Sequence, residues 1–265
     1  MRAVRKWQLA ILALSASMAM PALAKMQQRP LEWQLDGTTY SGVLVYDDAG
    51  DARRPGVVMV PNWRGVNDSA VQKAAQIAGD DYVVLVADVY GRNVRPRDDA
   101  GAGVASRPLR EDRALLRARA NAALEALKAQ AGRVPLDAGR IAAVGFCFGG
   151  TTVLEMARAG LPLAGVVSLH GGLSTPSPAA AHSGKVPVLV LNGAADKGTS
   201  SEDIVAFGKE MDAADADWQF VNFSGAVHCF AESDANSPPG CLYDPRAARR
   251  AWKMMGNFLE ERLGD

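Results

Sequence analysis

Histidine and cysteine are scarce in this chain of 265 residues, which contains only three of each. Neither sign of charge is in excess, because 29 acidic side chains balance 29 basic ones. The chain also has no internal repeat, no low-complexity tract and no linker rich in Pro, Gly or Ser. The balanced charge gives no indication of a nucleic-acid or membrane-surface partner. The lack of a linker favours a single domain.

The first 24 residues have the features of a secretory signal peptide. Three basic residues precede a mostly apolar stretch, and Ala22 and Ala24 give the small-residue pattern of a cleavage site. The apolar stretch is shorter than the roughly 20 residues that a membrane span needs, although a retained anchor is the alternative. We expect cleavage after Ala24 to leave residues 25–265, with 26 basic and 29 acidic side chains. This domain would be periplasmic or secreted, as a monomer or small homo-oligomer.

Three cysteines in an exported protein cannot all pair. Disulfides persist in oxidising compartments, so an odd number leaves one thiol over. Cys229 and Cys241 are twelve residues apart and flank a turn-rich segment. We therefore predict that they form a disulfide and that Cys147 is the free thiol. The alternative is that all three are reduced and buried.

Hydrophobic patterning predicts an α/β fold with a mostly parallel central sheet. Two alternating runs around Asp36 and Gly37 predict an opening antiparallel hairpin, because this dipeptide suits a tight turn. Continuous apolar runs, typical of strands buried on both faces, follow at residues 56–61, 82–90, 140–146, 163–170, 186–193 and 218–223. Helical patterns at 68–79, 107–131, 150–159, 201–214 and 245–263 alternate with them and predict helices on both faces. Residues 92–108 and 171–185 are expected to be loops that shape a pocket.

The sequence GFCFG, residues 145–149, lies between a predicted strand and a predicted helix. A nucleophile between small residues at such a turn projects above the sheet, because glycine permits the sharp reversal. The N-terminus of the helix that follows carries partial positive charge, which favours a thiolate. Cys147 is therefore predicted to be a nucleophile. The alternative is a buried structural cysteine.

A catalytic nucleophile needs a base, and the base needs an acid that orients it. Asp196 and His228 each follow a predicted strand, and they come after Cys147 in the chain order expected for this arrangement. His170 also ends a strand, so it is a candidate for the pocket wall and an alternative base. His182 falls in a segment rich in Pro, Ala and Ser. The alternative role for Asp196 is to cap a turn.

These motifs resemble those of the dienelactone hydrolase family, which has the α/β-hydrolase fold. The resemblance spans nearly all of the mature chain and includes VVMVPNWRGVND, VVLVADVYGR, GFCFGG, LNGAADKG and AVHCF, in the family's order. It implies hydrolysis of a small-molecule ester or lactone through a thioester, with Cys147, His228 and Asp196 as the triad and with no metal or cofactor. It also implies that the backbone N–H groups of Trp63 and Phe148 bind the oxyanion.

Two positions depart from the family's pattern. Asn62 stands where members carry a glutamate that helps to deprotonate the cysteine, and Glu232 stands where they carry the second of two carboxylate-binding arginines. Arg92 matches the first arginine, and Arg64 is a candidate substitute for the second. Tyr90 is a further candidate for the pocket wall. With one arginine lost, a carboxylated dienelactone is a less favourable substrate.

A second hypothesis, from another functional class, is a non-catalytic or redox protein that keeps the fold. In that hypothesis Cys147 is a reactive thiol, which oxidation could modify in an exported protein. The missing glutamate at Asn62 favours this alternative. A covalent acyl adduct at the cysteine favours the enzyme, whereas a stable sulfenate without turnover favours the alternative.

Overall fold

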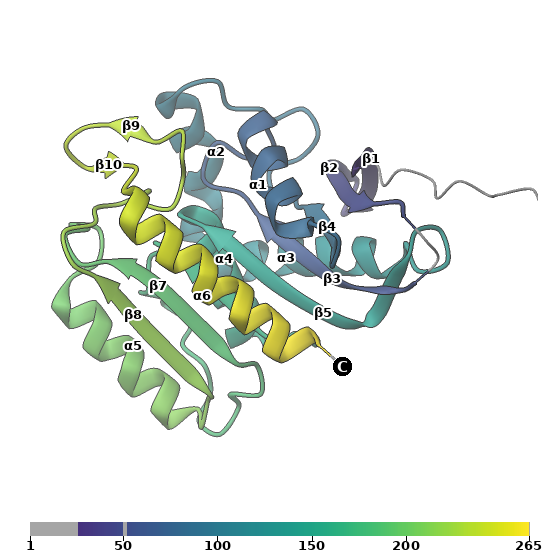
Figure 1. The fold of residues 1–265 in the computed structure, drawn as a ribbon. Helices are drawn as coiled ribbons and strands as arrows, with labels where there is room; N and C mark the ends of the chain where they lie inside the picture. Colours follow the sequence, from purple (N-terminus) through teal and green to yellow (C-terminus); the bar gives the residue numbers. More distant parts are fainter. Residues whose placement is uncertain (1–25, 50–51, 265) are drawn as a thin grey trace, which may run out of the picture.

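The computed structural model describes residues 26–49 and 52–264. The expected signal peptide lies outside these described residues. Within them, every helix is too short or too polar to cross a membrane. A central sheet runs through the molecule with helices on both sides (Figure 1).

The sheet has eight strands in the order β1-β2-β4-β3-β5-β6-β7-β8. The hairpin of β1 and β2 is antiparallel, and β2 pairs antiparallel with β4, whereas the other neighbours pair in parallel. Asp36 and Gly37 both have positive φ at the hairpin turn, as predicted. The strands are β1 (Met26–Leu35), β2 (Thr38–Asp47), β3 (Arg54–Val60), β4 (Val83–Val86), β5 (Leu136–Phe146), β6 (Val166–Leu169), β7 (Val188–Gly193) and β8 (Trp218–Phe223).

Two hydrophobic clusters fill the spaces above and below the sheet. Alternate residues of β3 face opposite ways, so that Val58 belongs to one cluster and Val57 to the other. Burying each such side chain contributes roughly 1.5–3 kcal/mol. Helices α1 and α6 cover one face, and the other helices cover the opposite face (Figure 1). The helices are α1 (Asp68–Ala78), α2 (Asp99–Glu111), α3 (Arg113–Lys128), α4 (Phe148–Arg158), α5 (Ser201–Ala213) and α6 (Pro245–Leu263).

Helix α2 corrects the prediction that residues 92–108 form a loop. Asp98 caps the helix by accepting a hydrogen bond from Gly101 N at 2.7 Å. The single helix expected over 107–131 is in fact two helices, which meet at Asp112. Two glycines and Pro108 lower the helix propensity of α2 and conceal it in the sequence. Its buried residues nevertheless have helical spacing: they are Ala102, Ser106 and Leu109.

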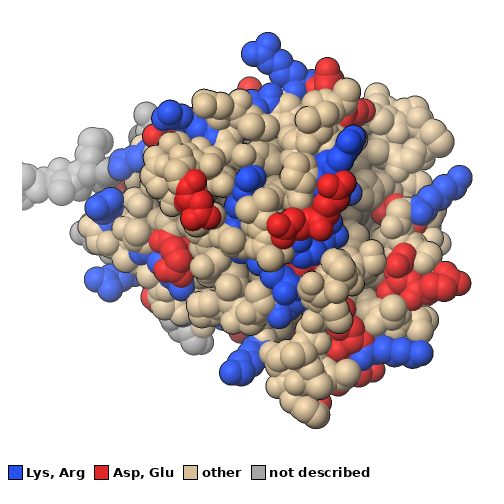
Figure 2. Space-filling model, turned by 180° about the vertical axis from the view of Figure 1, so that it is seen from behind, with Lys and Arg blue, Asp and Glu red and all other residues tan. Residues whose placement is uncertain are grey.

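The parallel strands place their carboxyl ends at one edge of the sheet. Short segments follow these ends, and most of the predicted site residues lie in them, as expected for this type of sheet. In addition, β9 (Asn236–Ser237) and β10 (Cys241–Leu242) form a small hairpin that the sequence patterns did not predict. Acidic and basic side chains are interspersed on the face seen from behind (Figure 2). That face therefore carries no patch of a single charge.

Candidate active site

Cys147 occupies a sharp turn between β5 and α4. Its backbone has φ 54° and ψ −116°, a conformation that residues with a side chain rarely adopt. The turn is possible because the flanking chain has no side chains in the way: a Cβ on Gly145 would collide with Gly149 O, and a Cβ on Gly149 would collide with Val60 O. The thiol is thereby held at the start of a helix, as the GFCFG pattern predicts.

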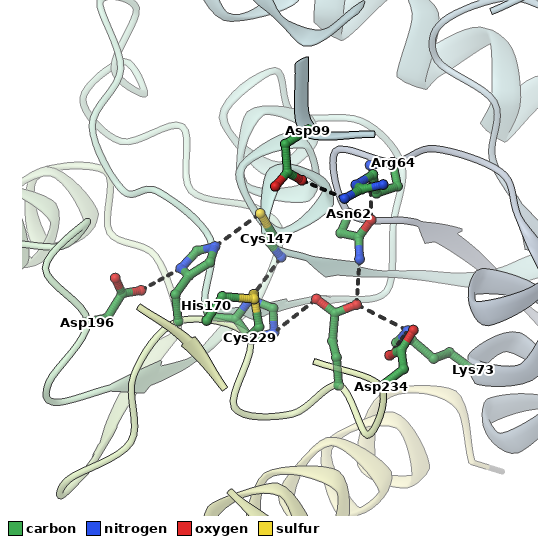
Figure 3. Close-up of a disulfide and its surroundings, with 12 residues drawn as sticks. Asn62, Arg64, Lys73, Asp99, Cys147, His170, Asp196, Cys229 and Asp234 are labelled. Atoms are coloured by element: carbon green, nitrogen blue, oxygen red, sulfur yellow. Dashed lines mark hydrogen bonds and ion pairs between the residues drawn. A yellow bond between two sulfur atoms is a disulfide. The ribbon is translucent and has the colours of Figure 1, made fainter. Parts of the chain in front are cut away.

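The side chains of Cys147, His228 and Asp196 meet in one hydrogen-bonded row (Figure 3). His228 Nε2 lies 3.0 Å from Cys147 Sγ, and His228 Nδ1 lies 2.7 Å from Asp196 Oδ2. The other carboxylate oxygen of Asp196 accepts a hydrogen bond from Gly198 N at 2.8 Å. Because the carboxylate engages Nδ1, Nε2 is free to take the proton of the thiol.

The surroundings of His228 favour its protonated form. Burial lowers the pKa of the ring, but hydrogen bonds with Asp196 and Cys147 outweigh this and raise the pKa to about 10. Burial also opposes the charge of Asp196, yet the hydrogen bond from His228 keeps the pKa of this carboxyl below its usual value. The arrangement therefore suits an imidazole that removes a proton from sulfur and holds it.

A cavity of about 490 Å³ opens beside the thiol and the imidazole. The segment after β3 lines it from one side, and the segment after His228 lines it from the other. Cavities of this size suit small organic ligands. Among the described residues, no group of three or more His, Cys, Asp or Glu side chains could hold a metal ion.

Comparison with known proteins identifies the family of this chain. The dienelactone hydrolase family model matches residues 41–263. This chain belongs to the dienelactone hydrolase family. The protein is therefore an ester or lactone hydrolase with the α/β-hydrolase fold.

Three known proteins show the extent of the similarity. The solved structure of a dienelactone hydrolase-like promiscuous phosphotriesterase from metagenomic libraries is 36% identical, with a TM-score of 0.83 over 90% of this chain and 99% of that one. A Bradyrhizobium protein named as a probable 2-oxo-3-(5-oxofuran-2-ylidene)propanoate lactonase is 27% identical over 238 residues, which are 84% of this chain and 90% of the relative. An α/β hydrolase from a Medee basin deep-sea metagenome library is 16% identical, with a TM-score of 0.63 over 90% of this chain and 98% of that one.

The predicted disulfide is confirmed. Cys229 and Cys241 are bonded, and Cys147 is free. The bond lies directly after His228, whose carbonyl oxygen accepts a hydrogen bond from Leu242 N at 3.1 Å. The segment that carries the base is thus tied to the small β9–β10 hairpin through both covalent and backbone contacts.

His170 lies behind the nucleophile rather than in the cavity. Its ring is fully buried, and its Nδ1 accepts a hydrogen bond from Cys147 N at 3.1 Å. Burial, together with His228 and Lys73, holds the pKa of His170 well below its usual value, so the ring is neutral. The nitrogen that could act as a base is occupied by the backbone. The alternative assignment of His170 as the base therefore lacks the geometry that His228 has.

Arg92 and Tyr90 are not among the residues that line this cavity. Arg92 is half exposed and pairs with Glu32 at 3.2 Å, in a separate hollow on the surface. The expected pocket position of Arg92 is corrected accordingly: the turn after β4 directs it toward the hairpin instead. Tyr90 is buried, donates a hydrogen bond to Trp63 O at 3.0 Å and stacks on Phe148 at 5.9 Å. It supports the cavity wall from behind.

Arg110 is a cavity residue that the sequence analysis missed. It lies near the end of α2, with its guanidinium 5.4 Å from the centre of the Phe148 ring. Its Nε donates a hydrogen bond to Ser106 Oγ at 3.3 Å, and it forms no ion pair with any described residue. Arg64, which was predicted for the pocket, also lines the cavity but pairs with Asp99 at 2.6 Å. The helical spacing of the buried residues of α2 is the sequence signal that could have placed Arg110 beside the cavity.

The predicted oxyanion donors belong to two different segments of the chain. Trp63 lines the cavity in the segment after β3. Phe148 is the first residue of α4, and the first N–H groups of a helix have no partner within it. The two N–H groups remain predicted oxyanion donors.

Asn62 and Glu232, the two positions that depart from the family's pattern, contact each other. Asn62 Nδ2 donates a hydrogen bond to Glu232 Oε2 at 2.6 Å, and Lys73 Nζ lies 3.1 Å from the same oxygen. Glu232 is only 2% exposed. Burial raises the pKa of Glu232, although Lys73 and Asn62 oppose the increase.

Proposed function

We propose that this chain hydrolyses a small ester or lactone through a thioester at Cys147. The row of short contacts from Cys147 to His228 to Asp196, at the base of a cavity, supports this proposal most directly. The chain's membership of a hydrolase family supports it independently.

The reaction begins when His228 Nε2 removes the proton from Cys147 Sγ. The thiolate attacks the carbonyl carbon, and the negative charge moves to the carbonyl oxygen, where the N–H groups of Trp63 and Phe148 stabilise it. The C–O bond to the leaving group then breaks, and His228 gives its proton to the leaving oxygen. In a lactone this oxygen stays attached to the acyl chain.

Water completes the cycle. His228 takes a proton from a water molecule, which attacks the thioester carbon through a second oxyanion. The C–S bond breaks, and the sulfur regains its proton from His228. Asp196 keeps its hydrogen bond to Nδ1 throughout and stabilises the imidazolium that forms twice in each cycle.

Arg110 supports a substrate that carries one carboxylate. It is the cation of the cavity that lacks an ion pair among the described residues, whereas Arg64 is paired with Asp99. The Bradyrhizobium relative is named for a lactone with a propanoate group, which carries one carboxylate. A charge-assisted contact of this kind contributes about 1.5–3 kcal/mol.

Export through the signal peptide is a further part of the proposal. The Cys229–Cys241 disulfide supports it, because such bonds persist in oxidising compartments. Expression with a C-terminal tag, followed by fractionation and intact-mass measurement, tests this proposal. We expect a periplasmic or secreted product that begins at Lys25, and a full-length cytoplasmic product would contradict it.

Replacement of the nucleophile tests the reaction itself. Cys147→Ala should abolish cleavage of a small aryl ester, while the wild type should give an acyl adduct at Cys147 in rapid-quench mass spectrometry. Circular dichroism would establish that the variant is folded. Retention of most of the activity in Cys147→Ala would refute the proposal.

A further inference from the structure

A buried carboxylate in the wall of the active-site cavity connects three separate segments. Glu232 follows the catalytic histidine, Asn62 follows β3, and Lys73 belongs to α1. The side chains of Glu232 and Lys73 are 3% and 11% exposed. In Figure 3, dashed lines run from Asn62 and Lys73 to this carboxylate.

One oxygen of Glu232 determines how Asn62 is held. Asn62 Nδ2 donates to Glu232 Oε2 at 2.6 Å, while Asn62 Oδ1 accepts a hydrogen bond from Arg64 N at 3.0 Å. The main-chain oxygen of Asn62 accepts another from Gly65 N at 2.9 Å. The peptide bond between Asn62 and Trp63 is therefore fixed from both sides. That peptide bond carries the Trp63 N–H, which is the predicted oxyanion donor.

The second oxygen of Glu232 faces His170, which accepts a hydrogen bond from the backbone of the nucleophile Cys147. Glu232 Oε1 lies 3.8 Å from His170 Nε2, and each of these buried atoms lacks a hydrogen-bond partner among the described residues. His170 Nδ1 accepts from Cys147 N, so the proton of the neutral ring is on Nε2. The N–H of His170 thus meets a carboxylate. If the distance between His170 Nε2 and Glu232 Oε1 shortened by less than about 1 Å, the two atoms would form a hydrogen bond.

We propose that Glu232 is a positioning residue that aligns the Trp63 N–H and the Cys147 turn with each other. Through Asn62 it fixes one wall of the oxyanion site, and through His170 it contacts the backbone of the nucleophile. This inference rests on the proposed thioester mechanism. Because the alignment matters most when charge develops on the carbonyl oxygen, Glu232 should affect the rate of acylation more than substrate binding.

Glu232→Gln is the central variant, because it keeps the shape of the side chain and removes its charge. We expect kcat for a neutral aryl ester to fall about 10- to 100-fold, with KM changed by less than about 3-fold. Since the variant leaves Lys73 without its buried partner, we expect a lower unfolding temperature. The double variant Lys73→Met/Glu232→Gln removes both charges, so its thermal stability should recover while kcat stays low.

Two comparisons separate positioning from general destabilisation. Glu210→Gln removes another largely buried glutamate, which pairs with Arg158 at 2.8 Å and does not line the cavity. It should lower the unfolding temperature with little effect on kcat. Asn62→Ala should lower kcat like Glu232→Gln, and the combination should lower kcat by less than the product of the two single effects, because the two residues share one contact.

Rapid-quench measurement of the Cys147 adduct separates a failure of the thioester mechanism from a failure of the proposed role of Glu232. Absence of an adduct in the wild type would refute the thioester mechanism. A wild-type adduct that forms equally fast in folded Glu232→Gln would overturn the role of Glu232 and leave the mechanism intact. Equal acylation by the wild type and by the Lys73→Met/Glu232→Gln variant would overturn it in the same way.

Discussion

Two of the walls of the cavity are constructed differently. The histidine wall, residues 228–241, is closed by the Cys229–Cys241 disulfide and contains the buried Glu232. The α2 wall, residues 99–111, reaches the cavity through exposed side chains. Its contact with the segment after β3 is the Arg64–Asp99 pair, whose side chains are 34% and 65% exposed. Exposed pairs of this kind contribute about 0–1 kcal/mol.

The difference separates chemistry from substrate selection. Reacting groups must keep their distances within a fraction of an ångström, and buried or covalent contacts provide that precision. A substrate-facing side chain such as Arg110 can change with little effect on the core. Changes in the histidine wall should therefore alter turnover and stability, whereas changes in the α2 wall should alter the choice of substrate.

Among the variants that test this comparison, Asp196→Asn should have the largest effect. An amide can donate a hydrogen bond to His228 Nδ1. The ring proton then stays on Nε2, so this nitrogen cannot accept the proton of the thiol. We expect kcat to fall on the order of 10³-fold or more, measured with a small aryl ester. An activity within about 10-fold of the wild type would contradict the assignment of Asp196 as the orienting acid.

Removal of the disulfide should produce the next largest effect. The bond closes a short loop, so Cys229→Ser/Cys241→Ser should lower the free energy of unfolding by about 3 kcal/mol, measured by urea denaturation. Turnover should fall as well, because the adjacent His228 loses its tie to the hairpin. An unchanged denaturation midpoint would show that the histidine wall does not depend on this bond.

The smallest effect should come from Arg110→Leu in the α2 wall. We expect kcat/KM for a carboxylated ester to fall roughly 10- to 100-fold, while the uncharged analogue changes by less than about 3-fold. Arg92→Leu is the matched control, since Arg92 pairs with Glu32 outside the cavity. Equal losses for charged and uncharged esters would refute a role for Arg110 in carboxylate recognition.

The sequence was informative where local patterns determine position. Buried parallel strands have continuous apolar runs, and the residues after them must lie at one edge, which brought Cys147, Asp196 and His228 together in the prediction. The twelve-residue spacing around a turn-rich segment likewise led to the correct disulfide. These inferences depend on strand ends and short loops, which a linear pattern can specify.

The cavity wall was predicted less well because its contacts join distant parts of the chain. The Asn62–Glu232 hydrogen bond spans 170 residues, and no local pattern indicates it. Arg92 matched a family position, but its side chain turns to Glu32, and Arg110 lies on a helix that glycines and a proline had concealed. Such side-chain directions are set by tertiary packing rather than by local propensity.

The glycines at positions 145 and 149 also limit how this protein can diversify. Even a methyl group at either one would strike the neighbouring main chain, so a single substitution there would disrupt the bend that displays the thiol. Random mutagenesis should recover almost no active clones with changes at these two sites. New specificities would have to arise elsewhere, and α2, with its exposed face, is the part of the rim best able to accept them.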